Sequence, residues 1–242
     1  MNVLIVTLGS RGDVQPCVAL GKGLKNAGHE VTICTSKLFQ PFITAQGLHY
    51  GPMNNQLMQL MDSDMGRDAM ENTHNLWGTI STTIKLFSQV KAMYRQTLQD
   101  VWQTTQAVKP NLLILASKAA FMAESIADKQ KIPLAIALPF PQFVPTAQSP
   151  AMGFPDWSLG RWYNRFTYWI VHTAIGLYGG IPNEFRRKVL QLPPKPKRMG
   201  LLHRADGSPI PVLHCYSQQV VPRPTDWPES AHVSGYWFLE QQ

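Results

Sequence analysis

The first 36 residues constrain the fold of this chain more than any other segment. Residues 2–8 are an unbroken β-branched and leucine-rich run, which is typical of a strand buried on both faces of a parallel sheet. A glycine-containing turn follows, and Pro16 stands where the first residue of a helix tolerates a missing N–H. We expect that helix to end at Gly28, and we expect a second strand over residues 31–35. This order predicts a β-turn-α-β unit.

The alternation of strand and helix continues along the rest of the chain. After a short strand, a long amphipathic helix is predicted whose apolar stripe belongs to the core. Later apolar strands flank a helix over residues 118–128. The predicted strands are 48–53, 111–116, 133–138, 212–216 and 231–235, and the stripe is Ile80, Ile84, Phe87, Val90, Tyr94 and Leu98. The pattern predicts an α/β fold with a doubly wound, mostly parallel sheet that binds ligands at the carboxyl ends of its strands. No internal boundary is visible, so we expect residues 1–242 to form one domain.

The charge of the chain argues against a dedicated nucleic-acid binder. Lys and Arg total 22 against 15 Asp and Glu, giving a net charge of +7, but the excess is spread over the second half. The basic residues that do cluster fit either a solvated helix face and turn, or a surface for anionic lipid or phosphate. They are Arg186, Arg187, Lys188, Lys195, Lys197 and Arg198.

Cysteine use and hydropathy predict a cytoplasmic protein. Cys17, Cys34 and Cys215 are too scattered for a disulfide framework or a zinc site, so we expect reduced, buried thiols. The charge-poor stretch 132–155 contains six prolines and therefore is not one membrane-spanning helix. The apolar segment 166–178 fits a helix that lines an apolar pocket or touches a bilayer from one side.

The first turn does not match the common nucleotide-binding patterns. Gly9 and Gly12 lack the spacing of G-x-G-x-x-G, and the second strand ends in Thr35 and Ser36 where an acidic residue is needed to bind a ribose. A G-x-x-x-x-G-K-[ST] motif does not occur. A nicotinamide enzyme and a P-loop protein are therefore disfavoured.

Asp13 is the residue in this turn that carries chemistry. It follows the first strand and precedes the helix, so its carboxylate faces the crevice near the positive end of a helix dipole, which keeps it ionised. There it could accept a proton. Asp is also a favourable N-cap residue, so capping of the helix explains the same position. The spacing alone leaves both interpretations open.

Three segments resemble a known family. GSRGDVQP at residues 9–16, AGHEVTICTS at 27–36 and VVPRPTDWPESAHVSGYWF at 220–238 are similar to the N-terminal domain of sterol glucosyltransferases and related antibiotic glycosyltransferases. The resemblance implies one half of the GT-B fold, in which two Rossmann-like domains face each other across a cleft. The N-terminal domain binds the acceptor, and the C-terminal domain binds the UDP-sugar.

The resemblance also implies a mechanism and roles for the turn. Transfer would invert the anomeric carbon, and Asp13 would take the proton from the attacking acceptor hydroxyl. Ser10 and Arg11 would shape the floor of the cleft and position the acceptor. No metal and no cofactor are expected, because a helix N-terminus and side chains of the other domain would meet the charge of the diphosphate.

A pocket for an apolar alcohol requires aromatic and aliphatic walls. Aromatic residues gather in the proline-rich segment and the following helix, where they fit such a pocket or ordinary packing. The candidates for contact with the acceptor are Phe140, Phe143, Phe154, Trp157 and Trp162, with Tyr163 beside them. His29 is expected to be structural, and the other histidines lack the spacing of metal ligands.

The chain ends at Gln242, within the predicted interdomain linker of about residues 220–242, so we expect the donor domain to lie outside it. Two functions remain open. The chain could be the acceptor-binding half of a hexosyltransferase, inactive without a donor-binding partner chain or domain, or a lipid-binding or small-alcohol-binding module without chemistry of its own. Arg161 and Arg165 beside the apolar segment add a hypothesis of peripheral membrane contact.

Overall fold

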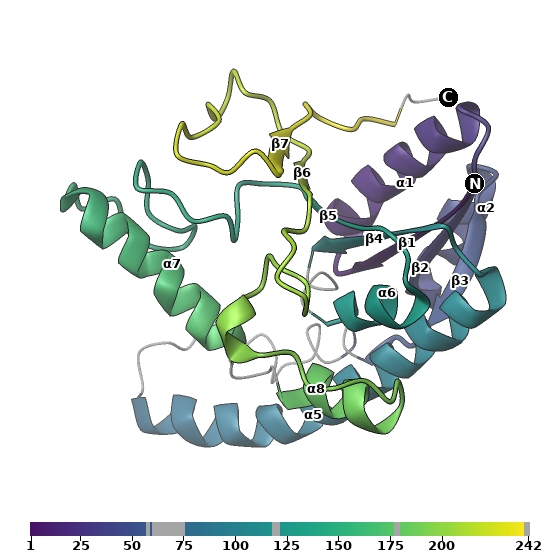
Figure 1. The fold of residues 1–242 in the computed structure, drawn as a ribbon, viewed down its shortest axis with the longest axis horizontal. Coiled ribbons are helices and arrows are strands. Elements are labelled where there is room, and N and C mark those ends of the chain that lie inside the picture. Colours follow the sequence, from purple (N-terminus) through teal and green to yellow (C-terminus); the bar gives the residue numbers. More distant parts are fainter. Residues whose placement is uncertain (57–58, 60–75, 118–121, 177–179, 240–242) are drawn as a thin grey trace.

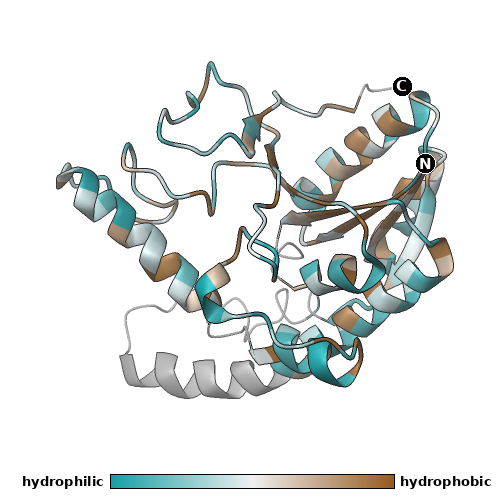
Figure 2. Cartoon of the chain, in the orientation of Figure 1, coloured by the Kyte–Doolittle hydropathy of each residue, from teal (hydrophilic) through white to brown (hydrophobic). Residues whose placement is uncertain are grey.

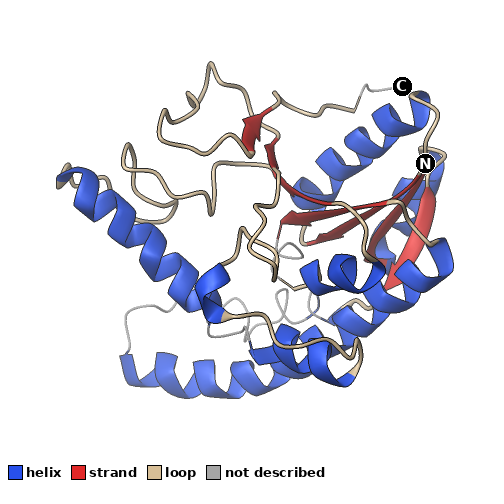
Figure 3. Cartoon of the chain, viewed as in Figure 1, coloured by secondary structure: helices blue, strands red, loops and turns tan. Residues whose placement is uncertain are grey.

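One parallel sheet organises the chain (Figures 1 and 3). The computed structural model describes residues 1–56, 59, 76–117, 122–176 and 180–239, with the backbone alone for residues 76–90. Within these residues, seven strands pair in the order β3-β2-β1-β4-β5-β6-β7, and every pair is parallel. The strands are β1 (Asn2–Leu8), β2 (Glu30–Ser36), β3 (His49–Met53), β4 (Leu112–Ser117), β5 (Leu134–Leu138), β6 (Val212–His214) and β7 (Ala231–Val233).

Helices cover both faces of this sheet. One face packs against α1 and α2, and the opposite face packs against α5, α6 and α8. The helical segments are α1 (Arg11–Asn26), η1 (Lys37–Phe39), α2 (Gln40–Ala45), α5 (Leu76–Val108), α6 (Glu124–Gln130), α7 (Gly160–Gly176), α8 (Gly180–Lys188) and η4 (Lys197–Met199). The predicted doubly wound α/β fold is confirmed.

The central strand β1 shows why its sequence is continuously apolar. Val3 and Ile5 point into the core layer beneath α1, whereas Leu4, Val6 and Leu8 point into the layer beneath α5 and α6. These five side chains are at most 2% exposed. Each contributes roughly 1.5–3 kcal/mol relative to an exposed position, so both faces of the strand must be apolar.

The start of α1 differs from the prediction. The helix begins at Arg11, and Pro16 lies inside it rather than at its first position. Ser10 is the N-cap residue, and its carbonyl oxygen accepts hydrogen bonds from the backbone N–H groups of Asp13 and Val14 at 3.0 and 3.2 Å. The polar first turn therefore starts the helix without proline, and the ring of Pro16 removes one backbone hydrogen bond further along.

Other boundaries also differ from the prediction. α6 begins at Glu124, and residues 118–121 of the predicted helix lie outside the described residues. β7 ends at Val233 because Gly235 turns the chain with a φ of +83°. Leu98 of the predicted stripe is fully buried and Tyr94 is half-buried, while the side chains of Ile80, Ile84, Phe87 and Val90 lie outside the described residues.

The clustered basic residues do not form one surface. Arg186 is only 3% exposed, and its Nη1 lies 2.6 Å from a carboxylate oxygen of Asp128. Arg204 binds the other oxygen of Asp128 at 2.9 Å, and Lys195 binds Glu124 at 2.7 Å. These pairs fasten α6 to α8 and to the segment that precedes β6. Part of the predicted basic cluster is therefore internal structure.

Replacing Asp128 tests this network. Asp128→Asn leaves the buried guanidinium of Arg186 without a counter-charge, so we expect a loss of about 3 kcal/mol in the free energy of unfolding, measured with urea. Glu184→Gln is the matched control, because its partners Arg95 and Lys188 are 45% and 70% exposed. Equal losses in the two variants would contradict the interpretation of Arg186 and Asp128 as a buried ion pair that stabilises the fold.

His214 makes stability depend on pH. Its side chain is buried and stacks on Trp227, and burial lowers the pKa of the imidazole to about 4. The unfolded chain binds a proton on His214 more readily than the folded protein does. The free energy of unfolding is therefore largest above the ordinary histidine pKa of about 6.5 and decreases as pH falls toward 4. The loss is of the order of 3 kcal/mol.

We therefore expect the wild-type protein to lose stability more steeply than His214→Gln between pH 7 and pH 4, as measured by urea unfolding. His203→Gln, at an exposed histidine, should keep the wild-type slope. An unchanged slope in His214→Gln would show that another group controls this range.

Candidate functional site

The turn after β1 holds the Asp13 carboxylate in a defined position. Its Oδ2 accepts hydrogen bonds from the backbone N–H of Ser10 at 2.9 Å and from the Ser10 hydroxyl at 3.3 Å. Its Oδ1 accepts a hydrogen bond from the hydroxyl of Ser117 at 2.7 Å. The side chain is half-buried. The prediction of Asp13 as the N-cap residue is wrong, because Ser10 is the N-cap and Asp13 is the third residue of α1. Asp13 completes a capping box with Ser10 and also connects the helix to a second strand.

These contacts lie at the topological switch point of the sheet. The chain passes from β1 to β2 on one side and later returns to place β4 on the other side of β1. Leu8 and Ser117 are partners at the carboxyl ends of β1 and β4. Ligands of open α/β sheets bind in the crevice at such a point. The hydrogen bond between Asp13 and Ser117 joins the β1 side of this switch point to the β4 side.

Gly9 provides the space for this arrangement. A Cβ atom at this position would lie 2.1 Å from Oδ2 of Asp13, and the φ angle of Gly9 is +152°. A larger residue would therefore clash with the carboxylate and strain the backbone. Gly9 is required because Asp13 folds back over the end of β1.

Ser117 is a site residue that the sequence analysis missed. It is buried at the last position of β4 and has a φ angle of +52°. Phe143, which follows the neighbouring strand β5, has a φ angle of +66°. Non-glycine residues in this region cost about 1–3 kcal/mol and cluster at functional sites. A serine directly after an apolar parallel strand was the signal available in the sequence.

Ser10 and Arg11 lie at the mouth of the turn. Ser10 is exposed and contacts Asp13 through both its backbone and its hydroxyl. The Nε of Arg11 donates to Gln15 at 3.2 Å, and its guanidinium lies 5.1 Å from the centroid of the Phe42 ring. Arg11 is thus directed toward α2, which contains Phe42.

Cys17 lies beneath Asp13, on the next turn of α1. Burial raises the pKa of its thiol to about 12, so the group stays protonated at neutral pH. The other two cysteines are also free and buried, which agrees with the sequence prediction. Cys17 is not activated as a nucleophile.

The predicted aromatic wall divides into two parts. Phe140 and Phe143 are half-buried in the loop after β5, and Phe143 packs against the core. Its carbonyl oxygen lies 2.7 Å from Nε2 of His172, whose pKa is lowered by burial, so the neutral ring donates to this oxygen. These two phenylalanines lie at the carboxyl edge of the sheet, as does Asp13.

The remaining aromatic candidates lie farther along the chain. Phe154 is half-buried, whereas Trp157 and Trp162 are 64% and 75% exposed. Trp157 stacks on Tyr163 with ring centroids 5.7 Å apart, and Trp162 stacks on Phe166 at 5.1 Å. The five candidates therefore differ in burial, since the three phenylalanines are half-buried and the two tryptophans are largely exposed.

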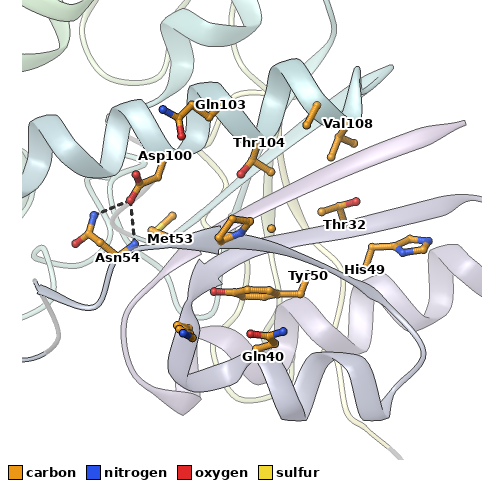
Figure 4. A pocket seen from close by; sticks show the side chains of 14 residues that line it. Thr32, Gln40, His49, Tyr50, Met53, Asn54, Asp100, Gln103, Thr104 and Val108 are labelled. Atoms are coloured by element: carbon orange, nitrogen blue, oxygen red, sulfur yellow. Dashed lines mark hydrogen bonds between the residues drawn. The ribbon is translucent and has the colours of Figure 1, made fainter.

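A separate groove of about 820 Å³ lies between the edge strand β3 and α5 (Figure 4). Tyr50, Asn54 and Asp100 are among its lining residues, and none of the predicted site residues lines it. One carboxylate oxygen of Asp100 accepts hydrogen bonds from the backbone and side-chain N–H groups of Asn54 at 2.9 and 2.8 Å. These bonds connect the end of β3 to α5, so the groove is a seam between two elements.

The fold and the first turn define a class of protein. The model of the glycosyltransferase family 28 N-terminal domain matches residues 3–148, and the chain belongs to this family. The sterol 3-beta-glucosyltransferase of Debaryomyces hansenii is 31% identical over 99% of the chain, and the UDP-sugar-dependent glycosyltransferase 52 of Dictyostelium discoideum is 28% identical over all of it. The chain spans only 14% of the length of each of these relatives.

Solved structures show the same fold. The glycosyltransferase of kitacinnamycin superimposes with a TM-score of 0.60 at 14% identity, covering 100% of this chain and 52% of that one. The calicheamicin glycosyltransferase CalG4 gives a TM-score of 0.60 at 12% identity, covering 97% of this chain and 52% of that one. The predicted Rossmann-like half of a GT-B fold is confirmed, and the resemblance to glycosyltransferases is confirmed with it.

Gly9→Ala tests the packing of the turn. The new Cβ would displace the Asp13 carboxylate from Ser10, so we expect the free energy of unfolding to fall by about 3 kcal/mol. Gly153→Ala is the control, since Gly153 also has a positive φ but has open space where a Cβ would lie, and its loss should be about 1 kcal/mol. Equal losses of the two variants in urea unfolding would show that backbone strain alone accounts for the need for glycine at position 9.

Proposed function

We propose that this chain is the acceptor-binding half of an inverting, UDP-sugar-dependent hexosyltransferase that glycosylates a sterol, a lipid or another apolar alcohol. The observation that carries the proposal is the Asp13 carboxylate, held at the switch point by Ser10 and Ser117. A group fixed at this edge of the sheet lies where a ligand of an open α/β sheet binds.

Asp13 is proposed as the general base. An alcohol is a weak nucleophile, so a base must take its proton as the new glycosidic bond forms. Oδ1 has a second lone pair beyond the one used by Ser117, whereas Oδ2 already accepts from both the N–H and the hydroxyl of Ser10. The three hydrogen bonds fix the orientation of the group, while the exposed part of the side chain leaves it accessible to an acceptor hydroxyl.

Phe140 and Phe143 are proposed as the inner part of the acceptor site, because they follow β5 at the same edge as Asp13. Trp157 and Trp162, with Phe154, are proposed as an outer part that the acceptor passes or contacts. An apolar alcohol is supported by the name of the Debaryomyces hansenii relative, a sterol 3-beta-glucosyltransferase. Aromatic walls with few polar groups suit such a molecule.

The donor is proposed to be a UDP-sugar bound by another domain, a partner chain or a further segment. The greater length of the relatives supports this division, since the chain matches 14% of the Debaryomyces hansenii protein. Residues 220–242 are proposed as the linker toward that domain. No metal ion is assigned a role, because a helix N-terminus of the donor domain can meet the diphosphate charge.

One observation favours a second function, a non-catalytic module that binds a lipid or small alcohol. Both oxygens of Asp13 already accept hydrogen bonds within the protein, so the capping of α1 and the contact with β4 account for the residue without catalysis. The two functions differ in whether a proton-accepting group is required.

The variant Asp13→Asn distinguishes the catalytic function from the non-catalytic binding module. The asparagine side-chain oxygen can still accept a hydrogen bond from the N–H of Ser10, but the amide cannot accept a proton from an alcohol. With a matching donor domain added, we expect wild-type protein to transfer sugar and the variant to lose roughly 10²–10⁴-fold in kcat. Binding of a cyclodextrin-delivered sterol should change little. The wild-type chain without the donor domain should be inactive.

Asp100→Asn serves as the control carboxylate, since Asp100 lies in the groove beside β3 and not in the first turn. It should keep the wild-type rate. Undiminished turnover by Asp13→Asn, with folding verified by circular dichroism, would exclude the proton-acceptor role. Sterol binding without transfer by wild type plus donor domain would favour the binding module.

Membrane contact is part of the proposal, in a peripheral form. No helix within the described residues is long and apolar enough to cross a bilayer. A sterol or lipid acceptor resides in a membrane, so a protein that takes it up benefits from contact with the bilayer surface.

A further inference from the structure

Helix α7 carries three stacked aromatic side chains on its outer face. Trp162, Phe166 and Trp169 are spaced by four and three residues, which places them on one side of the helix. Their exposed fractions are 75%, 38% and 61%. Ring centroids are 5.1 Å apart for the first pair and 5.5 Å for the second, with interplanar angles of 7° and 15°. We call these three residues the aromatic ladder.

The opposite face of α7 attaches the helix to the protein. The hydroxyl of Tyr163 donates to the carbonyl of Pro155 at 2.8 Å, and the hydroxyl of Thr167 accepts from the N–H of Ala151 at 2.8 Å. Tyr163, Thr167 and Tyr168 are buried. The ladder is therefore not needed to hold the helix, which projects away from the sheet (Figure 1) and combines hydrophobic and hydrophilic positions along its length (Figure 2).

Leaving such large apolar side chains in water is unfavourable unless a partner covers them. Stacking covers both faces of the Phe166 ring and one face of each tryptophan, so the stack presents mainly ring edges along its length and few free ring faces on which a sugar would stack. Tryptophan and phenylalanine edges are well suited to the boundary between lipid headgroups and acyl chains. This geometry favours a lipid surface over a carbohydrate.

Arginines next to the ladder in the sequence supply positive charge, and the loop before α7 exposes further apolar side chains. Arg161 and Arg165 are exposed beside the ladder, and Arg165 makes only a long contact of 3.5 Å with Asp226 while remaining 63% exposed. The loop before α7 adds exposed Met152 and Leu159, at 52% and 63%. Apolar side chains flanked by arginine are typical of helices that lie in a membrane interface and prefer anionic lipid.

We propose that the aromatic ladder docks this chain onto the surface of an anionic bilayer, with α7 lying in the interface. This inference rests on the proposed function in its choice of a lipid as occupant. The proposed docking also connects the bilayer surface with the proposed acceptor site. Nε2 of His172 on α7 donates to the carbonyl of Phe143, in the loop after β5, at 2.7 Å. Docking of α7 therefore holds the loop after β5 close to the bilayer that contains the acceptor.

The test is co-sedimentation of the full chain with vesicles of phosphatidylcholine, alone or mixed with phosphatidylserine, at low salt. We expect binding to the mixed vesicles. Phe166→Ala/Trp169→Ala should weaken it by roughly 10-fold or more, and Arg161→Gln/Arg165→Gln should weaken it by roughly 10-fold on the anionic vesicles only. Phe238→Ala, at a side chain 78% exposed in the C-terminal segment, is the matched control and should bind as wild type does.

Two outcomes would overturn the proposal: no vesicle binding by the wild-type chain, or equal binding by Phe166→Ala/Trp169→Ala. Self-association that depends on the ladder, in place of vesicle binding, would also overturn it and identify a protein contact. Binding of a cyclodextrin-delivered sterol is measured in parallel. Its absence in the wild type, with vesicle binding intact, would contradict the proposed acceptor while leaving the docking surface standing, so the two failures are distinguishable.

Discussion

The carboxylate of Asp13 is the contact on which the arrangement of the site depends. It accepts hydrogen bonds from the first turn of α1 and from Ser117 at the end of β4, and so connects the two strands between which the sheet reverses its order. Gly9 leaves room for it, and the positive φ of Ser117 directs a hydroxyl toward it. One side chain thereby fixes the helix start and the strand end, and it places a carboxylate between them.

The fold followed from the sequence because parallel strands buried on both faces must be apolar throughout. The runs that became β1, β2, β4 and β5 were visible for this reason, with boundaries within one residue at each end. The start of α1 was placed too late, since Pro16 is a strong local signal while the reciprocal contact between Ser10 and Asp13 depends on side-chain geometry. The pairing of Arg186 with Asp128 was also not predictable, because it joins residues 58 positions apart.

The candidate site was predicted in part. Asp13 and Ser10 are brought together, as the motif around them indicated, but Ser117 entered only through the pairing of β4 with β1. The aromatic residues show most clearly what could not be predicted from the sequence. Their composition indicated an apolar surface, yet composition does not distinguish Phe143, which packs on the core, from Trp162, which stacks outside on α7. That distinction depends on which face of the helix meets the preceding loop.

The central claim is that an acceptor binds at the switch point, with its hydroxyl near Asp13. Photo-crosslinking tests it most directly: a sterol with a photoreactive group close to its hydroxyl is bound to the chain, irradiated, and the labelled peptides are identified by mass spectrometry. We predict labels in the turn after β1 and in the loops after β4 and β5. Labels confined to the groove between β3 and α5 would contradict the account, because that groove shares no residue with the proposed site.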